Sequence, residues 1–110
     1  PRYFSSAASD VYKRQDTAGC LRAIETQANL MLKATRVDGV YDSDPETNEN
    51  AKFYDTLTFD DAILKNLKVM DATALTLARD HKLPINVFNV NQPDAVRDII
   101  SGKKIGTLIN

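Results

Sequence analysis

The chain has 110 residues, 43% of them hydrophobic, which is enough for one small domain with a modest core. Its formal charge of −1 comes with scattered Lys and Arg residues, so it lacks the basic stripe that binds a nucleic-acid backbone. There is no run of about 18 apolar residues and no secretory signal pattern, so we expect a cytoplasmic protein without a membrane partner.

Cysteine and histidine each occur once. Cys20 can form no internal disulfide, and its place in an amphipathic segment favours a packed apolar role over a nucleophilic one. His81 has no second His or Cys to complete a zinc site, so we expect it at the end of a helix. We predict no metal site built by the protein's own side chains.

Residues 1–15 do not share the pattern of the remaining chain. Residues 5–15 have no sustained helical or alternating period, and they look like translated adapter sequence from library construction. We therefore expect an artefactual or disordered tail over residues 1–15 and a folded domain over residues 16–110.

From Asp16 onward, segments with helical periodicity alternate with short apolar runs, which is typical of right-handed crossovers and a mainly parallel sheet. Asp16 or Thr17 is expected to cap the first helix. The predicted helices cover 16–28, 59–67, 69–82 and 93–102, and the predicted strands cover 29–35, 85–90 and 104–110. The helical side chains expected to face the core are Leu21, Ile24, Ala28, Ile63, Leu64, Leu67, Met70, Ala74, Leu77, Ala78, Val96, Ile99 and Ile100.

A polar loop follows the first predicted strand, within residues 33–45. Asp38-Gly39 is a strong turn signal there, because Gly tolerates a positive φ. Side chains just beyond the carboxyl end of a parallel strand face the crevice where ligands bind, so Thr35, Tyr41 and Asp44 could converge there. A solvated polar turn stays open as the alternative, since Asp, Ser and Pro are ordinary turn residues.

The flanking segments add to this expected site. We expect residues 42–52 to form a long loop that covers it, and Asn89 and Asn91 to bring amide groups to the end of the next strand. A calcium loop at Asp42-Ser43-Asp44 is excluded because Pro45 interrupts the pattern.

Residues 33–45, together with L-K-V-M-D at 67–71 and L-P-I-N-V-F-N at 83–89, resemble the bacterial uridylate kinases, the UMP kinases of the amino acid kinase family. D-T-A-G-C-L-R-A-I-E at 16–25 and G-T-L-I at 106–109 extend the resemblance to nearly everything after the first fifteen residues. It implies an α/β fold with a mainly parallel sheet and flanking helices, the C-terminal nucleotide-binding half of an amino acid kinase domain.

The resemblance also implies an activity: transfer of the γ-phosphoryl group of ATP to UMP, giving UDP and ADP in pyrimidine nucleotide biosynthesis. Mg²⁺ would accompany the ATP. The transition state of phosphoryl transfer carries negative charge on its equatorial oxygens, so catalysis depends on cations and on alignment of the substrates rather than on a covalent enzyme nucleophile. By resemblance, Thr35, Tyr41 and Asp44 bind ATP, and the parent protein is a homohexamer.

The candidate catalytic residues are Asp16, Lys68 and Asp71. Asp16 and Lys68 match family positions near the transferred phosphoryl group, and Asp71 follows Lys68 by three residues. Asp16 is expected to orient cationic side chains there, and capping a helix would be compatible with that role. Lys68 matches a phosphate-contacting lysine, with a solvated surface lysine as the alternative. Asp71 stands at a predicted helix start, where a plain cap is the alternative.

The family's amino-terminal half, with its lysine- and glycine-rich phosphate-binding segments, has no counterpart here, and its acceptor loop is matched only weakly. We therefore assign no UMP-binding residue and expect the chain to be a fragment that is inactive alone. Two rival functions stay open. One is another amino acid kinase with a carboxylate or carbamate acceptor, and the other is a non-catalytic nucleotide-binding regulatory module.

Overall fold

The described residues of the computed structural model are 3–7, 14–65, 67 and 70–110, with only the backbone described for 3–7 and 14–16. Within them the chain forms a five-stranded sheet and a separate two-stranded sheet. The first has the strand order β1 (Tyr3–Ala7), β2 (Leu30–Thr35), β6 (Ile85–Asn89), β7 (Thr107–Ile109), β5 (Thr56–Leu57), and the second pairs β3 (Val40–Tyr41) with β4 (Phe53–Tyr54).

The centre of the large sheet is parallel. β1, β2 and β6 run in one direction, with Met31 opposite Ile85 and Thr35 opposite Asn89. The middle of β2 and most of β6 are buried on both faces, as expected of parallel strands covered on both sides. The last strand, β7, is antiparallel to β6 and parallel to β5. The prediction of an α/β fold with a mainly parallel sheet is confirmed.

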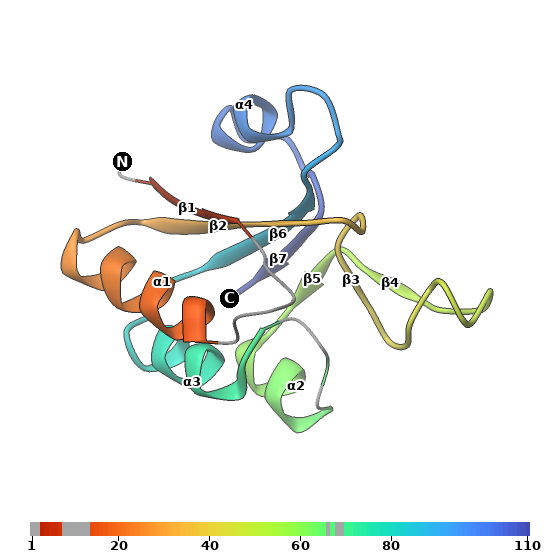
Figure 1. Ribbon diagram of the computed structural model, residues 1–110, viewed down its shortest axis with the longest axis horizontal. Coiled ribbons are helices and arrows are strands. Elements are labelled where there is room, and N and C mark those ends of the chain that lie inside the picture. Colours follow the sequence, from red (N-terminus) through yellow and green to blue (C-terminus); the bar gives the residue numbers. More distant parts are fainter. Residues whose placement is uncertain (1–2, 8–13, 66, 68–69) are drawn as a thin grey trace.

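The helices lie on both faces of this sheet. α1 (Arg14–Glu25), α2 (Phe59–Leu64) and α3 (Ala72–Asp80) lie below it in Figure 1, and the short α4 (Ala95–Ile100) lies above it. His81 is the C-cap of α3, which confirms its expected place at a helix end. None of the helices in the described part of the chain has the length and apolar character needed to cross a bilayer.

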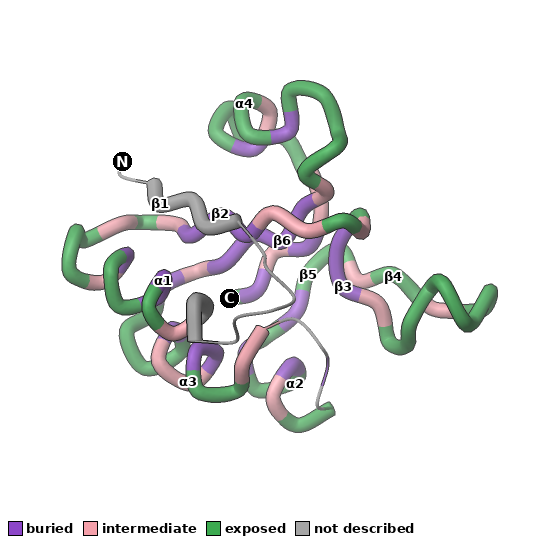
Figure 2. Tube along the Cα trace, in the orientation of Figure 1, coloured by how far each residue is buried: buried purple, intermediate pink, exposed green. Residues whose placement is uncertain are grey.

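The main core fills the space between the sheet and α1–α3. Cys20 of α1 is fully buried there, with its thiol 3.6 Å from the Met31 sulfur and 3.6 Å from the Ala74 carbonyl oxygen. This confirms its packed apolar role. Figure 2 shows the buried stretches in the central strands.

A smaller cluster lies on the opposite face of the sheet, where Leu32 and Phe88 pack under Ala95 and Ile99 of α4. Asn86 stands opposite Leu32 on β6, and its buried Oδ1 has no hydrogen-bond partner in the described structure.

The expectation that residues 1–15 lie outside the fold is wrong for two segments. Tyr3–Ala7 forms β1, paired in register with β2 from Leu30 to Ala34, and residues 14–15 begin α1. The strand was missed because a parallel strand needs no polar–apolar alternation. Residues 1, 2 and 8–13 lie outside the described residues, and the origin of the segment stays a hypothesis.

The predicted inward faces of the helices need correction. Leu64 of α2 is 84% exposed, and Leu21, Val96 and Ile100 are exposed as well. Each of these helices turns a face toward the sheet that includes only some of the predicted side chains. On α4 that face is Ala95 and Ile99.

The predicted helix starts also shift. α1 begins at Arg14, so Asp16 and Thr17 lie inside its first turn rather than at its cap. α4 begins at Ala95 after Asp94, which has a left-handed backbone (φ 60°), so Pro93 precedes the helix instead of occupying its first turn.

Candidate functional site

The carboxyl ends of β2 and β6 meet at one edge of the sheet, with Thr35 opposite Asn89. The Thr35 hydroxyl lies 2.7 Å from the Val37 carbonyl oxygen and 3.2 Å from that of Phe88, and it accepts the Val37 N–H at 3.3 Å. The Val90 N–H donates to the Thr35 carbonyl at 2.8 Å. Thr35 therefore ties the start of the polar loop to both strands.

Asn89 joins the same loop to β6. Its Nδ2 donates to Asp38 Oδ1 at 3.1 Å, and its Oδ1 accepts the Asn91 N–H at 2.9 Å. Asn89 thus stands at the strand end where the sequence places it, holding the turn after β2. Asn91 is exposed in the turn that follows β6.

The polar stretch after the turn forms a β-hairpin. In it Val40 pairs with Tyr54 and Tyr41 with Phe53, and the Tyr41 and Phe53 rings meet edge to face with centroids 5.3 Å apart. The loop at its tip begins and ends beside this pair, where the Lys52 N–H donates to Asp42 Oδ1 at 2.7 Å. The hairpin projects from the sheet at the end where β2 finishes (Figure 1).

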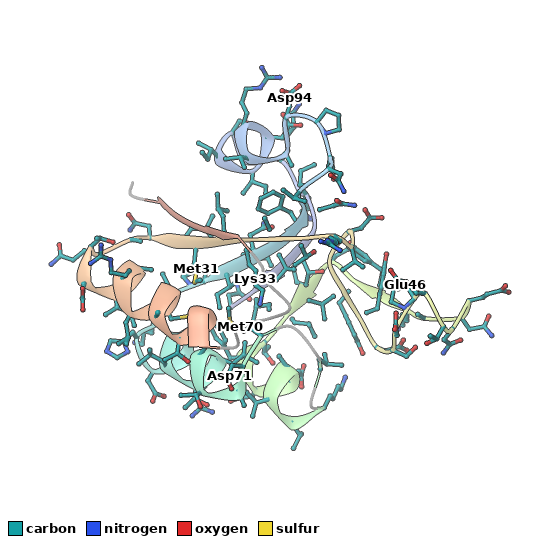
Figure 3. The ribbon with its side chains drawn as sticks, viewed as in Figure 1. Met31, Lys33, Glu46, Met70, Asp71 and Asp94 are labelled. Atoms are coloured by element: carbon teal, nitrogen blue, oxygen red, sulfur yellow. The ribbon has the colours of Figure 1, made fainter. Side chains whose placement is uncertain are left out.

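Asp44 lies on the exposed part of this projection, two residues before Glu46, which Figure 3 labels there. Its Oδ1 accepts the Glu46 N–H at 2.9 Å, and its carbonyl oxygen accepts the Asn48 N–H at 2.9 Å. Asp44 therefore organises a turn, as the alternative interpretation requires, while Oδ2 makes no hydrogen bond to the described residues.

The three predicted ATP-contacting residues follow one another along a single segment. Within the described residues, no hydrogen bond or ring contact joins the side chains of any two among Thr35, Tyr41 and Asp44. Their predicted convergence on a nucleotide stays a prediction.

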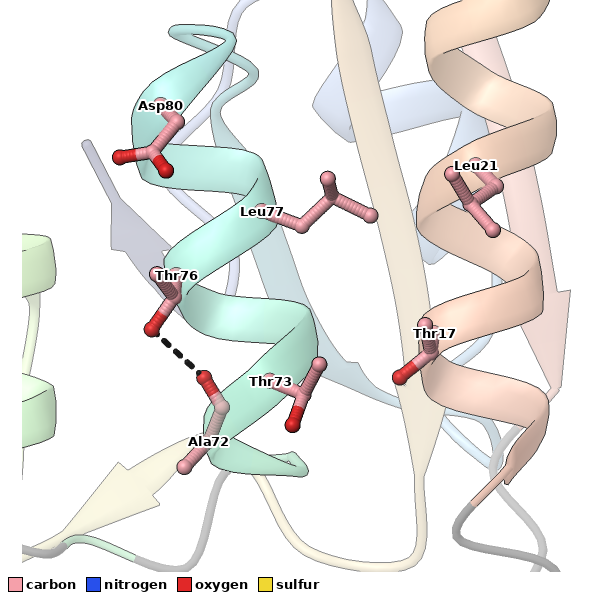
Figure 4. Close-up of a pocket in the computed structure, with 7 residues that line it drawn as sticks. All are labelled: Thr17, Leu21, Ala72, Thr73, Thr76, Leu77 and Asp80. Atoms are coloured by element: carbon pink, nitrogen blue, oxygen red, sulfur yellow. Dashed lines mark hydrogen bonds between the residues drawn. The ribbon is translucent and has the colours of Figure 1, made fainter.

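Two cavities of the structure lie elsewhere, and neither is lined by those three residues. A groove of about 560 Å³ between α1 and α3, shown in Figure 4, is lined by Thr17, Leu21, Ala72, Thr73, Thr76, Leu77 and Asp80. A second, of about 380 Å³, lies where β2 and β6 approach α4, lined by Ala34, Phe88, Val90, Gln92, Asp94, Ala95, Val96 and Arg97.

The candidate catalytic residues are described to different extents. Asp71 is half-buried and is the N-cap of α3, where its carboxylate accepts the Thr73 N–H at 3.3 Å. This confirms the cap and leaves the catalytic role a prediction. Asp16 is placed in the first turn of α1 by its backbone alone, and Lys68 lies outside the described residues.

Sequence reasoning gave no role to Lys33, which is buried on β2 and shares a strand face with Met31. The available signal was a single charge inside an apolar run. In the part of the chain that is described, no three His, Cys, Asp or Glu side chains gather in a group that could hold a metal ion.

The comparison with known families identifies this arrangement. The sequence profile of the Amino acid kinase family matches residues 8–89, and the chain belongs to that family. The match includes β2, the hairpin and β6, which carry the polar strand ends described above, and also α3.

Individual relatives carry more specific names. The chain is 51% identical over 107 residues to a uridylate kinase of Pectobacterium atrosepticum, a match that covers 97% of this chain and 44% of that protein. Among solved structures it resembles a UMP kinase from Bacillus anthracis, with a TM-score of 0.85 and 45% identity over 87% of this chain and 40% of the other. It also resembles a UMP kinase from Ureaplasma parvum, with a TM-score of 0.80 and 44% identity over 87% of this chain and 41% of the other. The chain thus spans less than half the length of these proteins.

Proposed function

We propose that this chain is the ATP-binding part of a UMP kinase, which transfers the γ-phosphoryl group of ATP to UMP. The observation that carries the proposal is the identity of about half the residues to named uridylate kinases across nearly the whole chain. The local geometry supports it, because a ring-bearing hairpin is anchored at the carboxyl edge of a parallel sheet, where α/β folds bind ligands.

In this proposal Thr35, Tyr41 and Asp44 hold the nucleoside part of ATP. The Tyr41 ring supplies a flat apolar surface, and the free carboxylate oxygen of Asp44 supplies a hydrogen-bond acceptor. For Thr35, whose hydroxyl already contacts backbone carbonyls, the contribution is to fix the loop start.

The phosphoryl end of ATP would lie toward Asp16, Lys68 and Asp71. There a lysine neutralises charge on the transferred group and carboxylates orient the cations around it. Mg²⁺ is proposed to enter with ATP, because it retains water and prefers phosphate oxygens to all-protein sites.

Assembly into a homohexamer and a cytoplasmic location belong to the same proposal, and they rest on the resemblance to uridylate kinases. Light scattering on a purified protein that contains the chain would measure the assembly directly.

The test is a chimaera in which this chain replaces the matching 107 residues of the Pectobacterium atrosepticum uridylate kinase. A second chimaera starts the replacement at Asp16, so that the relative's own segment stands before it. We expect ADP release that depends on UMP in at least the second chimaera. The acceptor is tested on the full-length protein that contains this chain, where a carboxylate or carbamate replacing UMP would favour another amino acid kinase and ATP binding without turnover would favour a regulatory module.

The 110-residue chain assayed alone is expected to release no ADP in response to UMP, since alignment of both substrates needs more than a donor-binding part. UMP-dependent turnover by the isolated chain would contradict this expectation.

A further inference from the structure

Thr107 is a fully buried polar residue at the start of β7, and its hydroxyl contacts both strands of the hairpin. It accepts the Val40 N–H at 2.9 Å and donates to the Tyr54 carbonyl oxygen in a short hydrogen bond. Val40 and Tyr54 stand directly opposite each other in the hairpin. One hydroxyl therefore bridges the base of β3 and the base of β4.

The position of that hydroxyl is fixed by the large sheet. Thr107 pairs with Val87 of the central strand β6. The preceding Gly106 has φ 70°, and a Cβ on it would lie 2.0 Å from the Val87 carbonyl oxygen. Because only glycine fits this approach, the start of β7 is pressed against β6.

The hairpin also approaches Thr107 closely. A Cβ on Gly39 would lie 2.5 Å from Thr107 Oγ1 and 2.7 Å from the Phe53 ring. The backbone just before β3 is therefore packed against both the hydroxyl and the aromatic pair.

These contacts act on Tyr41 because it is adjacent to Val40, and its ring partner Phe53 is adjacent to Tyr54. We infer that Thr107 is a positioning residue, which holds the hairpin so that the Tyr41 ring is presented to the nucleotide. The inference rests on the proposed function for the nucleotide, whereas the link between Thr107 and the hairpin rests on the contacts above.

Two substitutions of Thr107 in the active chimaera separate the effect of its hydrogen bonds from the effect of its packing. Thr107→Val keeps the shape and removes both hydrogen bonds, and Thr107→Ser keeps the hydroxyl. Thr76→Val is the matched control, because the Thr76 hydroxyl donates to the Ala72 carbonyl at 2.9 Å within α3 (Figure 4). In Figure 1, α3 lies apart from the hairpin strands β3 and β4. The measurements are KM for MgATP, KM for UMP, kcat and amide hydrogen exchange at Val40.

We expect Thr107→Val to raise the KM for MgATP about tenfold, as loss of a buried hydrogen-bond pair would, with the KM for UMP unchanged. The Val40 amide should exchange faster, because its acceptor is gone. Thr107→Ser and Thr76→Val should match the unaltered chimaera in all four measurements.

Unchanged exchange at Val40 in Thr107→Val would overturn the anchoring of the hairpin. Faster exchange with an unchanged KM for MgATP would overturn the link to the nucleotide. If Thr107→Val does not fold, Thr107→Ser provides the test. A raised KM for MgATP in Thr107→Ser would overturn the inference, because it would show that the packing of the Thr107 methyl group matters rather than its hydroxyl. An unaltered chimaera without activity would reject the proposed function, while exchange at Val40 would still decide the anchoring.

Discussion

Several side chains of this chain have a structural role that is visible and a chemical role that is proposed. Asp71 is the clearest, because the structure shows its carboxylate capping α3, whereas its catalytic role is a proposal. Sequence alone could not separate the two, since an acidic residue at a helix start can serve either role.

Asp71→Asn separates the two roles of Asp71, because Asn caps a helix as well as Asp does but carries no charge. If Asp71 acts at the phosphoryl group, kcat of the chimaera should fall about a hundredfold, the scale of losing one electrostatic contact in a transition state. The free energy of unfolding in urea should stay nearly unchanged. Asp71→Ala, the control for the cap, should lose about 1 kcal/mol of stability. An unaltered kcat in Asp71→Asn would show that Asp71 only caps the helix and has no catalytic role.

Gly39 shows a residue predicted correctly for the wrong reason. The sequence suggests a turn glycine with positive φ, but the positive-φ glycines of the described structure are Gly102 and Gly106. Gly39 is required instead because Thr107 and Phe53 leave no room for a Cβ. That contact joins residues far apart in the chain, so no local pattern reveals it.

Gly39→Ala is therefore expected to destabilise the protein by about 1–3 kcal/mol, the usual cost of forcing atoms into a packed interior. Urea unfolding of the chimaera measures this free energy. The exposed substitution Ala72→Gly, at the first residue of α3, serves as a control for changes unrelated to the hairpin. A neutral Gly39→Ala would show that the hairpin base can move aside freely.

At the scale of elements, helices and strands with strong apolar patterns were predictable, including β2, α3 and β6. The face that each helix turns inward was less predictable, because a helix can carry several apolar stripes and tertiary contacts determine which one is buried. α4 illustrates this, since Val96, Ile99 and Ile100 are all apolar and only Ile99 among them is buried.

The orientation of α4 predicts a difference between neighbouring isoleucines. Ile99→Ala should lower the free energy of unfolding by about 2–4 kcal/mol, because it leaves a cavity above Leu32 and Phe88. Ile100→Ala, at a side chain that is 46% exposed, should lose much less. Urea unfolding of both variants measures the difference, and equal losses would mean that α4 packs in another orientation.

At the scale of the whole molecule, the alternation of helices and strands was sufficient to predict the α/β class. The antiparallel direction of β7 and the β3–β4 hairpin were not predictable, because tertiary contacts help to fix both: Thr107 bridges Val40 and Tyr54, each more than fifty residues away in the sequence. The candidate site depends on these long-range contacts. The residue types of the candidate site could therefore be named from the sequence, but the residues that hold them in place could not.

We propose that the hairpin at the carboxyl edge of β2 binds the nucleoside of ATP. A crystal structure of the chimaera with a non-hydrolysable ATP analogue and Mg²⁺ tests it most directly. We predict the adenosine beside the Tyr41 ring, within hydrogen-bond reach of Asp44 and next to the end of β2 at Thr35. An analogue bound in the groove between α1 and α3, with the hairpin left free, would contradict this proposal.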